Sequence, residues 1–310
     1  MLNILFSAKP AAWDEYQAPL NAAFAECGLH ASLSRDHAPG DVDYIIFAPN
    51  GPVTDFTPYT KTKAVMGLWA GVETVVDNAT LTQPLCRLVD ESLTDGMIEW
   101  VTGHTLRHHL GMDLHITNQD GVWRDGIIPP VAANRPVTIL GIGALGAACG
   151  QALHQLGFPV TGWSRSAKDI PNIRCLHGDE GLEEALKDAQ IVILLLPQTP
   201  QTMNIINAET IARMARGGFV INPGRGPLID DRALLEALDS GQLAHATLDV
   251  FRTEPLPPDH PFWAHPKVTV MPHIASTTRA ETAARVIAEN ITRGQAGKPL
   301  HYLVDRGLAY

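Results

Sequence analysis

The stretch "VTILGIGALGAACGQAL" constrains this chain most, because it sets three glycines between an apolar run and a helical pattern. Gly141, Gly143 and Gly146 have the spacing G-x-G-x-x-G. The first permits a tight turn, the second lets a ligand approach the backbone, and the third lets helix and strand pack closely. The helix that follows offers N–H groups and its positive dipole end to a pyrophosphate. The motif predicts a dinucleotide site that includes Ala144 and Leu145; a purely structural glycine turn is the alternative.

Around this motif, apolar strand-like runs alternate with helical patterns. The runs lie at residues 137–140, 158–163, 191–196, 218–222, 246–251 and 267–273. Strands that alternate with helices are typical of a parallel sheet with helices on both faces. We therefore predict an α/β fold in which the second part of the chain is a doubly wound, Rossmann-type sheet.

The N-terminal part of the chain has its own, smaller α/β pattern. Apolar runs at residues 2–7, 42–49 and 63–69 predict parallel strands separated by helices. Helical patterns at residues 93–112 and 277–297 predict two long helices. Because 310 residues are many for one hydrophobic core, two domains are expected.

Composition narrows the class of protein further. Hydrophobic residues make up 45% and charged residues 18%, which is typical of a globular protein. A formal net charge of −10 argues against a nucleic-acid partner, and no apolar run is long enough to cross a membrane. The four cysteines have no paired or metal-binding spacing, and the N-terminus has no signal-peptide pattern, so we expect a cytoplasmic protein. Trp123 and Trp163 are expected to be packing residues.

The strand-like run after the glycine helix ends in "WSRS". Sites that bind NAD carry an Asp or Glu about 20 residues after the glycines, and this acid bonds the ribose 2′-hydroxyl. Ser164 takes that position here. An acid would repel a 2′-phosphate by roughly 4 kcal/mol at ~4 Å, whereas Arg165 and the hydroxyls of Ser164 and Ser166 offer it donors. The stretch favours NADPH, with NADH possible; the alternative is a solvated surface arginine.

Three further stretches place reactive side chains at or near the ends of strand-like runs, where an open α/β sheet binds its ligands. "VINPGRGPLIDD" carries Arg225, "TLDVFRTEPLPP" carries Asp249 and Glu254, and "VTVMPHIAST" carries His273. A protonated His273 can donate a proton to a carbonyl oxygen, and Glu254 would favour the imidazolium. Arg225 can hold a carboxylate and polarise the carbonyl. Together these residues suit the reduction of a 2-keto acid by hydride, although each one alone would be interpreted as structural.

These motifs, in this order, resemble those of the D-isomer-specific 2-hydroxyacid dehydrogenase family, and within it the enzymes that reduce glyoxylate and hydroxypyruvate. The likeness extends from "GLWAGVETV" through "LLLPQTPQTMNII" to the terminal "LVDRGLAY". The resemblance implies that Arg225, Glu254 and His273 are the catalytic residues. It also implies a flavodoxin-like substrate domain, residues 1–98 and 286–310, and a dinucleotide-binding domain, residues 99–285.

The same resemblance assigns further binding residues. It implies that Pro197 and Asp249 contact the cofactor, Asp249 near the nicotinamide carboxamide, although Asp249 could instead cap a turn. It implies that main-chain N–H groups of one loop bind the substrate carboxylate. This substrate loop consists of Trp69, Ala70, Gly71 and Val72. Trp69 is expected either to narrow the pocket for small substrates or to belong to the core.

The resulting prediction is a 2-hydroxyacid dehydrogenase that uses NADPH to reduce glyoxylate to glycolate and hydroxypyruvate to D-glycerate. The alternatives are a bulkier 2-keto acid such as phenylpyruvate, and a nucleotide-sensing regulator on a dehydrogenase scaffold. The resemblance implies a homodimer through the helix of residues 93–112 and its neighbouring segment. No metal is expected: His104 and His108 have helical spacing, but no acid lies between them as in H-E-x-x-H, so a polar helix face or a subunit contact is favoured.

Overall fold

The computed structural model describes residues 1–306 and divides into two compact units. Unit 1 comprises Met1–Leu93 and Thr277–Tyr310, and unit 2 comprises Thr94–Ser276. Of the boundaries expected after residues 98 and 285, the second falls inside α9 (Ala280–Gln295), a helix that belongs entirely to unit 1. Residues 307–310, which end the expected C-terminal segment and its "LVDRGLAY" motif, lie outside the described residues.

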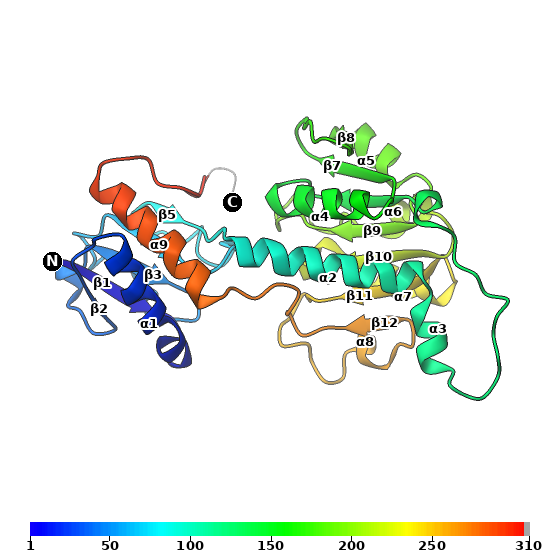
Figure 1. Ribbon diagram of the computed structural model, residues 1–310, viewed down its shortest axis with the longest axis horizontal. Coiled ribbons are helices and arrows are strands. Elements are labelled where there is room, and N and C mark those ends of the chain that lie inside the picture. The colour runs from blue at the N-terminus through cyan, green and yellow to red at the C-terminus, as the bar shows by residue number, and fades with distance from the viewer. Residues whose placement is uncertain (307–310) are drawn as a thin grey trace. The chain divides into compact units, whose positions relative to one another are not determined.

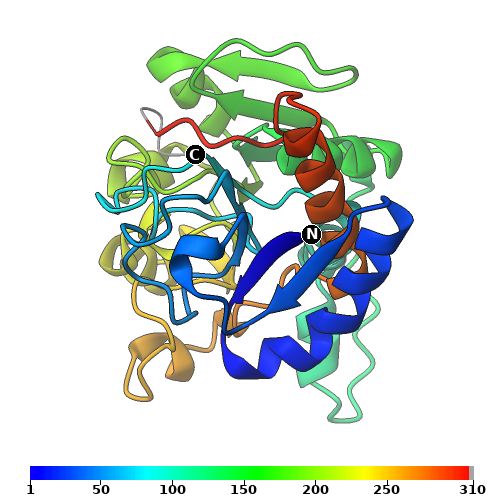
Figure 2. The same ribbon diagram turned by 90° about the vertical axis from the view of Figure 1, so that its left-hand side faces the viewer.

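Unit 1 is built on a parallel five-stranded sheet in the order β2-β1-β3-β4-β5. Its strands are β1 (Leu2–Ser7), β2 (Ala31–Ser34), β3 (Tyr44–Phe47), β4 (Ala64–Gly67) and β5 (Leu85–Cys86). This is the flavodoxin-like strand order. Helices α1 (Pro10–Glu26) and α9 pack together on one face of the sheet (Figures 1 and 2). They bury Phe6 and Ile46 there. Loop residues such as Phe56 and Val75 cover the opposite face.

Unit 2 is built on a parallel seven-stranded sheet in the order β12-β11-β10-β9-β6-β7-β8. Its strands are β6 (Val137–Leu140), β7 (Val160–Ser164), β8 (Arg174–His177), β9 (Ile191–Leu194), β10 (Gly218–Asn222), β11 (Leu243–Leu248) and β12 (Val268–Val270). The strand order reverses between β6 and β9, as in a Rossmann sheet, and ligands bind at such a switch point. The predicted α/β fold with a doubly wound sheet is confirmed.

Side-chain alternation along these strands explains why helices cover both faces of the sheet. Ile139 and Ile193 pack against α2 (Glu91–His109) and α4 (Ala144–Gln155). The next residues along the same strands, Leu140 and Leu194, pack on the other face. The helices on that face are α5 (Gly178–Leu186), α6 (Ala208–Arg213) and α7 (Asp231–Asp239). Figure 1 shows these helices along the strands of unit 2. Because both faces are buried, the strands consist of nearly continuous apolar runs.

The remaining elements are short. They are α3 (Met112–Thr117), α8 (Pro261–Ala264) and the 3-10 turns Pro39–Asp41, Ala132–Asn134 and Gly226–Leu228. The helix expected over residues 93–112 ends earlier, at His109, because Gly111 adopts a left-handed conformation with φ +62° and the chain starts α3 after it. Within residues 1–306, no helix combines the length and apolar character that crossing a membrane would require.

Two expectations about single residues are wrong. Trp123 is 88% exposed and is not a packing residue, whereas Trp163, at 7% exposure, is one. His108 does not belong to a polar helix face: it is buried, and its Nε2 lies 2.9 Å from Thr247 Oγ1. Among the described residues, no group of three or more His, Cys, Asp or Glu side chains could hold a metal ion.

Candidate active site

The glycine turn after β6 has the geometry that its motif requires. Gly141 adopts φ +105°, and a Cβ there would lie 2.5 Å from the Leu195 carbonyl carbon. A Cβ on Gly146 would lie 1.9 Å from the Gly141 oxygen, so only glycine allows α4 to pack this closely on the turn. A Cβ on Gly143 would meet no atom within 4 Å. The backbone at Gly143 is therefore open to a ligand, while its two partner glycines are needed by the fold itself.

The start of α4 completes an anion cradle. Gly143 is the N-cap and no side chain caps the helix, so its first N–H groups remain for a ligand. Ala144 is exposed and Leu145 half-buried. A dinucleotide pyrophosphate fits this cradle, because backbone donors and the helix dipole favour an anion without a further charged side chain.

The end of β7 lies beside this cradle. The N–H groups of Gly141 and Ile142 donate to the Trp163 oxygen at 2.8 and 3.3 Å, which joins the glycine turn to the last residues of β7. Ser164 Oγ donates to the Ser166 oxygen at 2.8 Å, and Arg165 is exposed. The "SRS" segment thus begins at the last residue of β7, the strand next to the glycine turn, which is where the ribose 2′-position of a dinucleotide is recognised.

Pro197 follows β9 at the same edge of the sheet. Leu195 N donates to the Leu140 oxygen at 2.8 Å, so the segment after β9 continues beside the glycine turn. Thr202 Oγ1 donates to the Pro197 oxygen at 2.8 Å and fixes the loop between β9 and α6. The predicted cofactor contact of Pro197 stays a prediction.

His273 and Glu254 form the central pair of the candidate site. His273 Nδ1 lies 2.7 Å from Glu254 Oε2, and Glu254 Oε1 accepts a hydrogen bond from Phe251 N at 2.8 Å. His273 has φ +56°, a conformation that is costly for a non-glycine residue and is often found at functional sites. Its N–H donates to the Asp249 oxygen at 2.8 Å. Because Glu254 takes Nδ1, the atom that can act on a substrate is Nε2.

Electrostatics of this pair favour a protonated imidazole. The hydrogen bond that His273 donates to Glu254 raises the pKa of His273; burial opposes the rise, and the charges of Glu254 and Asp249 add to it. For Glu254, burial alone would raise the pKa, but the hydrogen bond from His273 and the N–H of Phe251 lower it overall. The ring is therefore held as a proton donor beside a carboxylate that stays ionised.

Arg225 lies in the turn after β10, and Gly226 brings this turn against the loop that carries Glu254. A Cβ on Gly226 would lie 2.0 Å from the Phe251 carbonyl carbon, so only glycine fits. The charge of Arg225 acts on both members of the pair: it lowers the pKa of Glu254 and of His273. The structure thus brings Arg225, Glu254 and His273 together within unit 2.

Asp249 has a structural role that the sequence left open. It is 1% exposed, and its two carboxylate oxygens accept hydrogen bonds from Ile274 N and Ala275 N, both at 2.8 Å. Burial raises its pKa, while these two N–H groups lower it. The carboxylate therefore holds the turn that presents His273. The predicted contact of Asp249 with a nicotinamide carboxamide stays a prediction.

Asn222 is a site residue that sequence reasoning missed. Its side chain is fully buried, donates to the Arg225 oxygen at 2.9 Å and accepts from Gly224 N at 3.1 Å. It thereby shapes the turn that carries Arg225. The available signal was an amide residue at the end of a buried strand directly before a Pro-Gly turn.

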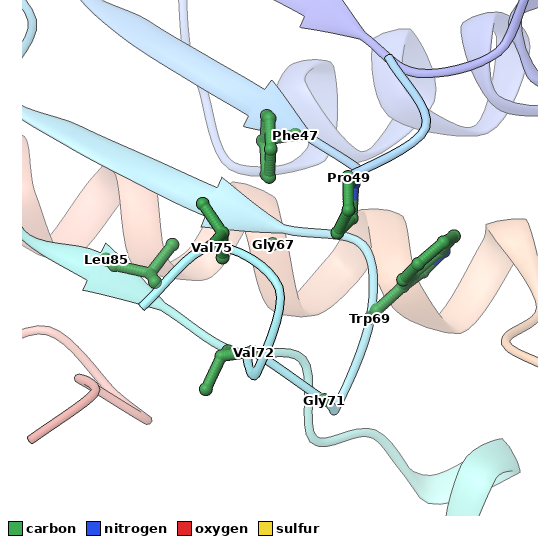
Figure 3. Close-up of a pocket in the computed structure, with 8 residues that line it drawn as sticks. All are labelled: Phe47, Pro49, Gly67, Trp69, Gly71, Val72, Val75 and Leu85. Carbon is green, nitrogen blue, oxygen red and sulfur yellow. The ribbon is translucent and has the colours of Figure 1, made fainter. Parts of the chain in front are cut away.

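The substrate loop follows β4 in unit 1. Its main-chain N–H groups, from Trp69 to Val72, donate to no other residue within the part of the chain that the structure describes. Successive unpaired main-chain N–H groups are donors that suit a carboxylate. Trp69 is 43% exposed, so it is not a core residue. Gly71 and Val72 line a small pocket with Leu85 (Figure 3).

The Rossmann sheet, the glycine turn and the carboxylate-held imidazole together define the class of protein: a dinucleotide-dependent dehydrogenase. Comparisons with known proteins identify the family. Residues 104–275 match the family model of the D-isomer specific 2-hydroxyacid dehydrogenase NAD binding domain. The chain belongs to the D-isomer specific 2-hydroxyacid dehydrogenase family, and the predicted resemblance is confirmed.

Two curated relatives carry the same name. The glyoxylate/hydroxypyruvate reductase A of Serratia proteamaculans (strain 568) is 36% identical over 317 residues, which cover 100% of both chains. That of Yersinia enterocolitica is 38% identical over 251 residues, 78% of this chain and 80% of the relative. Both are reductases of the glyoxylate/hydroxypyruvate type.

Solved structures agree with this family over the whole chain. A D-isomer specific 2-hydroxyacid dehydrogenase from Xanthobacter autotrophicus Py2, in complex with NADPH and MES, has a TM-score of 0.92 at 37% identity and covers 99% of both chains. An NADPH-dependent glyoxylate/hydroxypyruvate reductase from Sinorhizobium meliloti, in complex with NADP and sulfate, has a TM-score of 0.90 at 33% identity and covers 100% of both.

Proposed function

We propose that this chain is an NADPH-dependent reductase of small 2-keto acids that converts glyoxylate to glycolate and hydroxypyruvate to D-glycerate. The observation that carries the proposal is the 2.7 Å contact between His273 Nδ1 and Glu254 Oε2, in the same Rossmann-type unit as a dinucleotide cradle. The names of the curated relatives and the cofactors of the solved structures support it.

The catalytic residues have separate tasks. When bound, NADPH supplies the hydride that reduces the carbonyl carbon. Negative charge then develops on the carbonyl oxygen, and His273 Nε2 donates its proton there as the general acid. Glu254 keeps the imidazole protonated and fixes its orientation through Nδ1. Arg225 polarises the carbonyl and stabilises the developing charge. In the oxidative direction His273 accepts the proton.

Cofactor choice rests on the segment after β7. Gly141, Gly143 and Gly146, with the N–H groups of Ala144 and Leu145, would hold the pyrophosphate. Arg165, with Ser164 and Ser166, would bind the 2′-phosphate that distinguishes NADPH from NADH. Pro197 and Asp249 would line the nicotinamide end. The absence of an acid at position 164 removes the repulsion that the 2′-phosphate would otherwise meet.

Within unit 1, substrate binding is proposed for the substrate loop; in unit 2, it is proposed for Arg225. The unpaired N–H groups of Trp69, Ala70, Gly71 and Val72 suit a carboxylate, and the exposed ring of Trp69 would limit the size of the group next to it. In this proposal unit 1 is the substrate domain and unit 2 the dinucleotide-binding domain. A small, anionic 2-keto acid satisfies both features.

A homodimer is part of the proposal. The segment of residues 118–131, here called the arm, is ordered by its own contacts: Arg124 Nη1 and Nη2 bind the two carboxylate oxygens of Asp120 at 2.7 and 2.6 Å. Its apolar side chains nevertheless face solvent, Trp123 at 88% and Ile128 at 83% exposure. An ordered segment with outward apolar side chains fits a second copy of this chain.

The cytoplasm is the proposed compartment, since the four cysteines are free.

Steady-state kinetics with both cofactors test the proposed function. We expect kcat/KM to be higher with NADPH than with NADH, and higher for glyoxylate and hydroxypyruvate than for phenylpyruvate. A higher kcat/KM for phenylpyruvate would show that the reaction is the proposed one but that the preferred substrate is a bulkier 2-keto acid. NADPH binding without any reduction of 2-keto acids would instead indicate a nucleotide-sensing protein and overturn the proposal.

A further inference from the structure

Arg87 lies directly beside the substrate loop. It follows β5, and the next residue, Leu88, donates its N–H to the Trp69 oxygen at 2.9 Å. The two strands approach closely here: a Cβ on Gly67, just before the loop, would lie 2.8 Å from the Cys86 oxygen and 3.6 Å from the Arg87 Cα. The backbone of Arg87 is thereby fixed against the start of the loop.

The alternation of side chains places Arg87 on the loop's side of the sheet. Cys86 and Leu88 belong to the cluster under α1 and α9. Leu85 points to the other face, where it lines a small pocket with Gly71 and Val72 (Figure 3). Because side chains of an extended chain alternate between faces, Arg87 is on the face of Leu85. The guanidinium therefore shares that face with the pocket and the loop.

No described residue of unit 1 balances the charge of Arg87. The side chain is half-buried, and burial lowers its pKa, an effect that Tyr302 partly offsets. Its guanidinium forms no hydrogen bond or ion pair with any residue from 1 to 306. By contrast, Arg306 in the same unit donates to the Leu81 and Gln83 oxygens. A partly desolvated cation without a partner gains most from an anionic ligand.

We propose that Arg87 is a substrate-binding residue: its guanidinium binds the carboxylate of the 2-keto acid together with the main-chain N–H groups of the substrate loop. The inference rests on the proposed function, since it names the group that recognises the substrate of that reaction. A planar guanidinium can take both carboxylate oxygens at once, and loop amides alone cannot supply a charge.

Kinetics of two Arg87 variants provide the first test. Arg87→Gln should raise KM for glyoxylate and hydroxypyruvate by about tenfold or more, with kcat less affected and KM for NADPH within about twofold of the unmodified protein. Arg87→Lys should recover part of the loss because it keeps the charge and loses the planar fork. The matched control is Arg35→Gln, an exposed arginine of unit 1 that lies over Trp13; it should leave every constant unchanged.

Chemical modification of arginines in the protein without substitutions provides a second test, which does not depend on the folding of a variant. Phenylglyoxal modifies accessible arginines, and oxamate serves as a carboxylate analogue of the substrate. With NADPH present, oxamate should slow the modification of Arg87, measured by peptide mass spectrometry, and should not slow that of Arg35. Equal modification of Arg87 with and without oxamate would overturn the inference.

The outcomes separate this inference from the proposed function. If the unmodified protein does not reduce glyoxylate or hydroxypyruvate, the proposed function fails. If it does so and folded Arg87→Gln keeps the same KM for both acids, the assignment of Arg87 alone is wrong.

Discussion

At the scale of single residues, the proposed mechanism predicts that the hydrogen bond between His273 and Glu254 determines the pH range of the reaction. In that mechanism reduction requires the protonated imidazole, so we expect activity below the pKa of His273 and its loss as the pH rises through it. Glu254 raises that pKa. Glu254→Gln removes the charge, so the loss of kcat/KM should move to lower pH, with activity at pH 8 reduced by roughly tenfold or more.

A pH profile of kcat/KM for glyoxylate measures this shift. Glu236→Gln is the matched control, because Glu236 pairs with Arg232 on the exposed surface of α7. An unchanged profile in Glu254→Gln would contradict the assignment of His273 as the acid that Glu254 tunes.

Cofactor selection is a second property of single residues. Arg165→Ala should raise KM for NADPH by about tenfold, since a hydrogen bond to a charged group contributes roughly 1.5–3 kcal/mol, and should change KM for NADH little. Arg174→Ala is the control, because Arg174 lies on the neighbouring strand β8 and pairs with Glu184. Equal effects on the two cofactors would remove Arg165 from the 2′-phosphate site.

At the scale of elements, Arg252 connects three loops of unit 2. Its guanidinium donates to the Ile229 oxygen and to Asn204 Oδ1, and Nε lies 3.4 Å from Asp231 Oδ1. Ile229 ends the turn that begins at Arg225, and Arg252 itself lies in the loop that carries Glu254. The side chain of Arg252 thus fixes the distance between the turn that carries Arg225 and the loop that carries Glu254, although it contacts neither of these two side chains.

Arg252→Gln should therefore lower kcat more than it raises KM for NADPH. Loss of these charge-assisted bonds should also lower the free energy of unfolding by about 1–3 kcal/mol. The measurements are steady-state kinetics and urea denaturation, with Arg232→Gln, whose partner Glu236 is exposed, as the control. A variant with reduced stability and an unchanged kcat would show that Arg252 stabilises the fold without positioning the site.

The helix α2 contributes buried histidines that make unit 2 sensitive to acid. Burial, with a smaller contribution from the charge of Arg107, lowers the pKa of His104 to about 4, that of His108 to about 2, and that of His245, which packs on His108, to about 4. Arg135 adds to the lowering at His108, whereas Asp113 opposes it at His104 and His245. Since the folded pKa values lie below the unfolded value of ~6.5, stability is full above that pH and is lost as the pH falls.

Because each of these histidines takes up a proton in the unfolded chain, each should lower the free energy of unfolding at pH 5 by about 2 kcal/mol relative to neutral pH. His245→Gln should therefore reduce the loss of stability between pH 7.5 and pH 5, measured by urea denaturation at both pH values. The exposed His115 of α3 provides the control variant His115→Gln. The same pH dependence in the His245 variant and in the unmodified protein would contradict a buried, neutral His245.

At the scale of the whole molecule, the sequence predicts those helices and strands that are determined by their own residues. The central strands of unit 2 are buried on both faces and consist of apolar runs, so they were predictable. The strands β2, β5 and β8 were not, because β2 and β8 are partly exposed edge strands and β5 has only two residues. Their pairing partners, rather than their composition, make them strands.

The candidate site, too, has residues that a local sequence motif identifies and residues that only their contacts in the fold identify. The glycine spacing and the stretches that carry Arg225, Glu254 and His273 identify residues by type and order. Asn222 and Arg252 were not predicted. Their side chains shape the site by hydrogen bonds to the main-chain oxygens of Arg225 and Ile229, and only folding brings these groups together. Arg87 escaped for a related reason: what distinguishes it is the absence of a partner among the described residues.

The arm of residues 118–131 carries the last prediction, which concerns assembly. Apolar side chains on an ordered surface segment lose solvent contact when two copies associate, at about 25 cal/mol per Å² of apolar area. Light scattering should therefore give a mass of two chains, each of 33.5 kDa. The double variant Trp123→Ser/Ile128→Ser should give the mass of one, because it removes the two most exposed of these side chains from the arm. Leu156→Ser, a 46% exposed leucine after α4, should remain a dimer. A single-chain mass for the unmodified protein at all concentrations, or a dimer that survives the double variant, would exclude the arm as the interface.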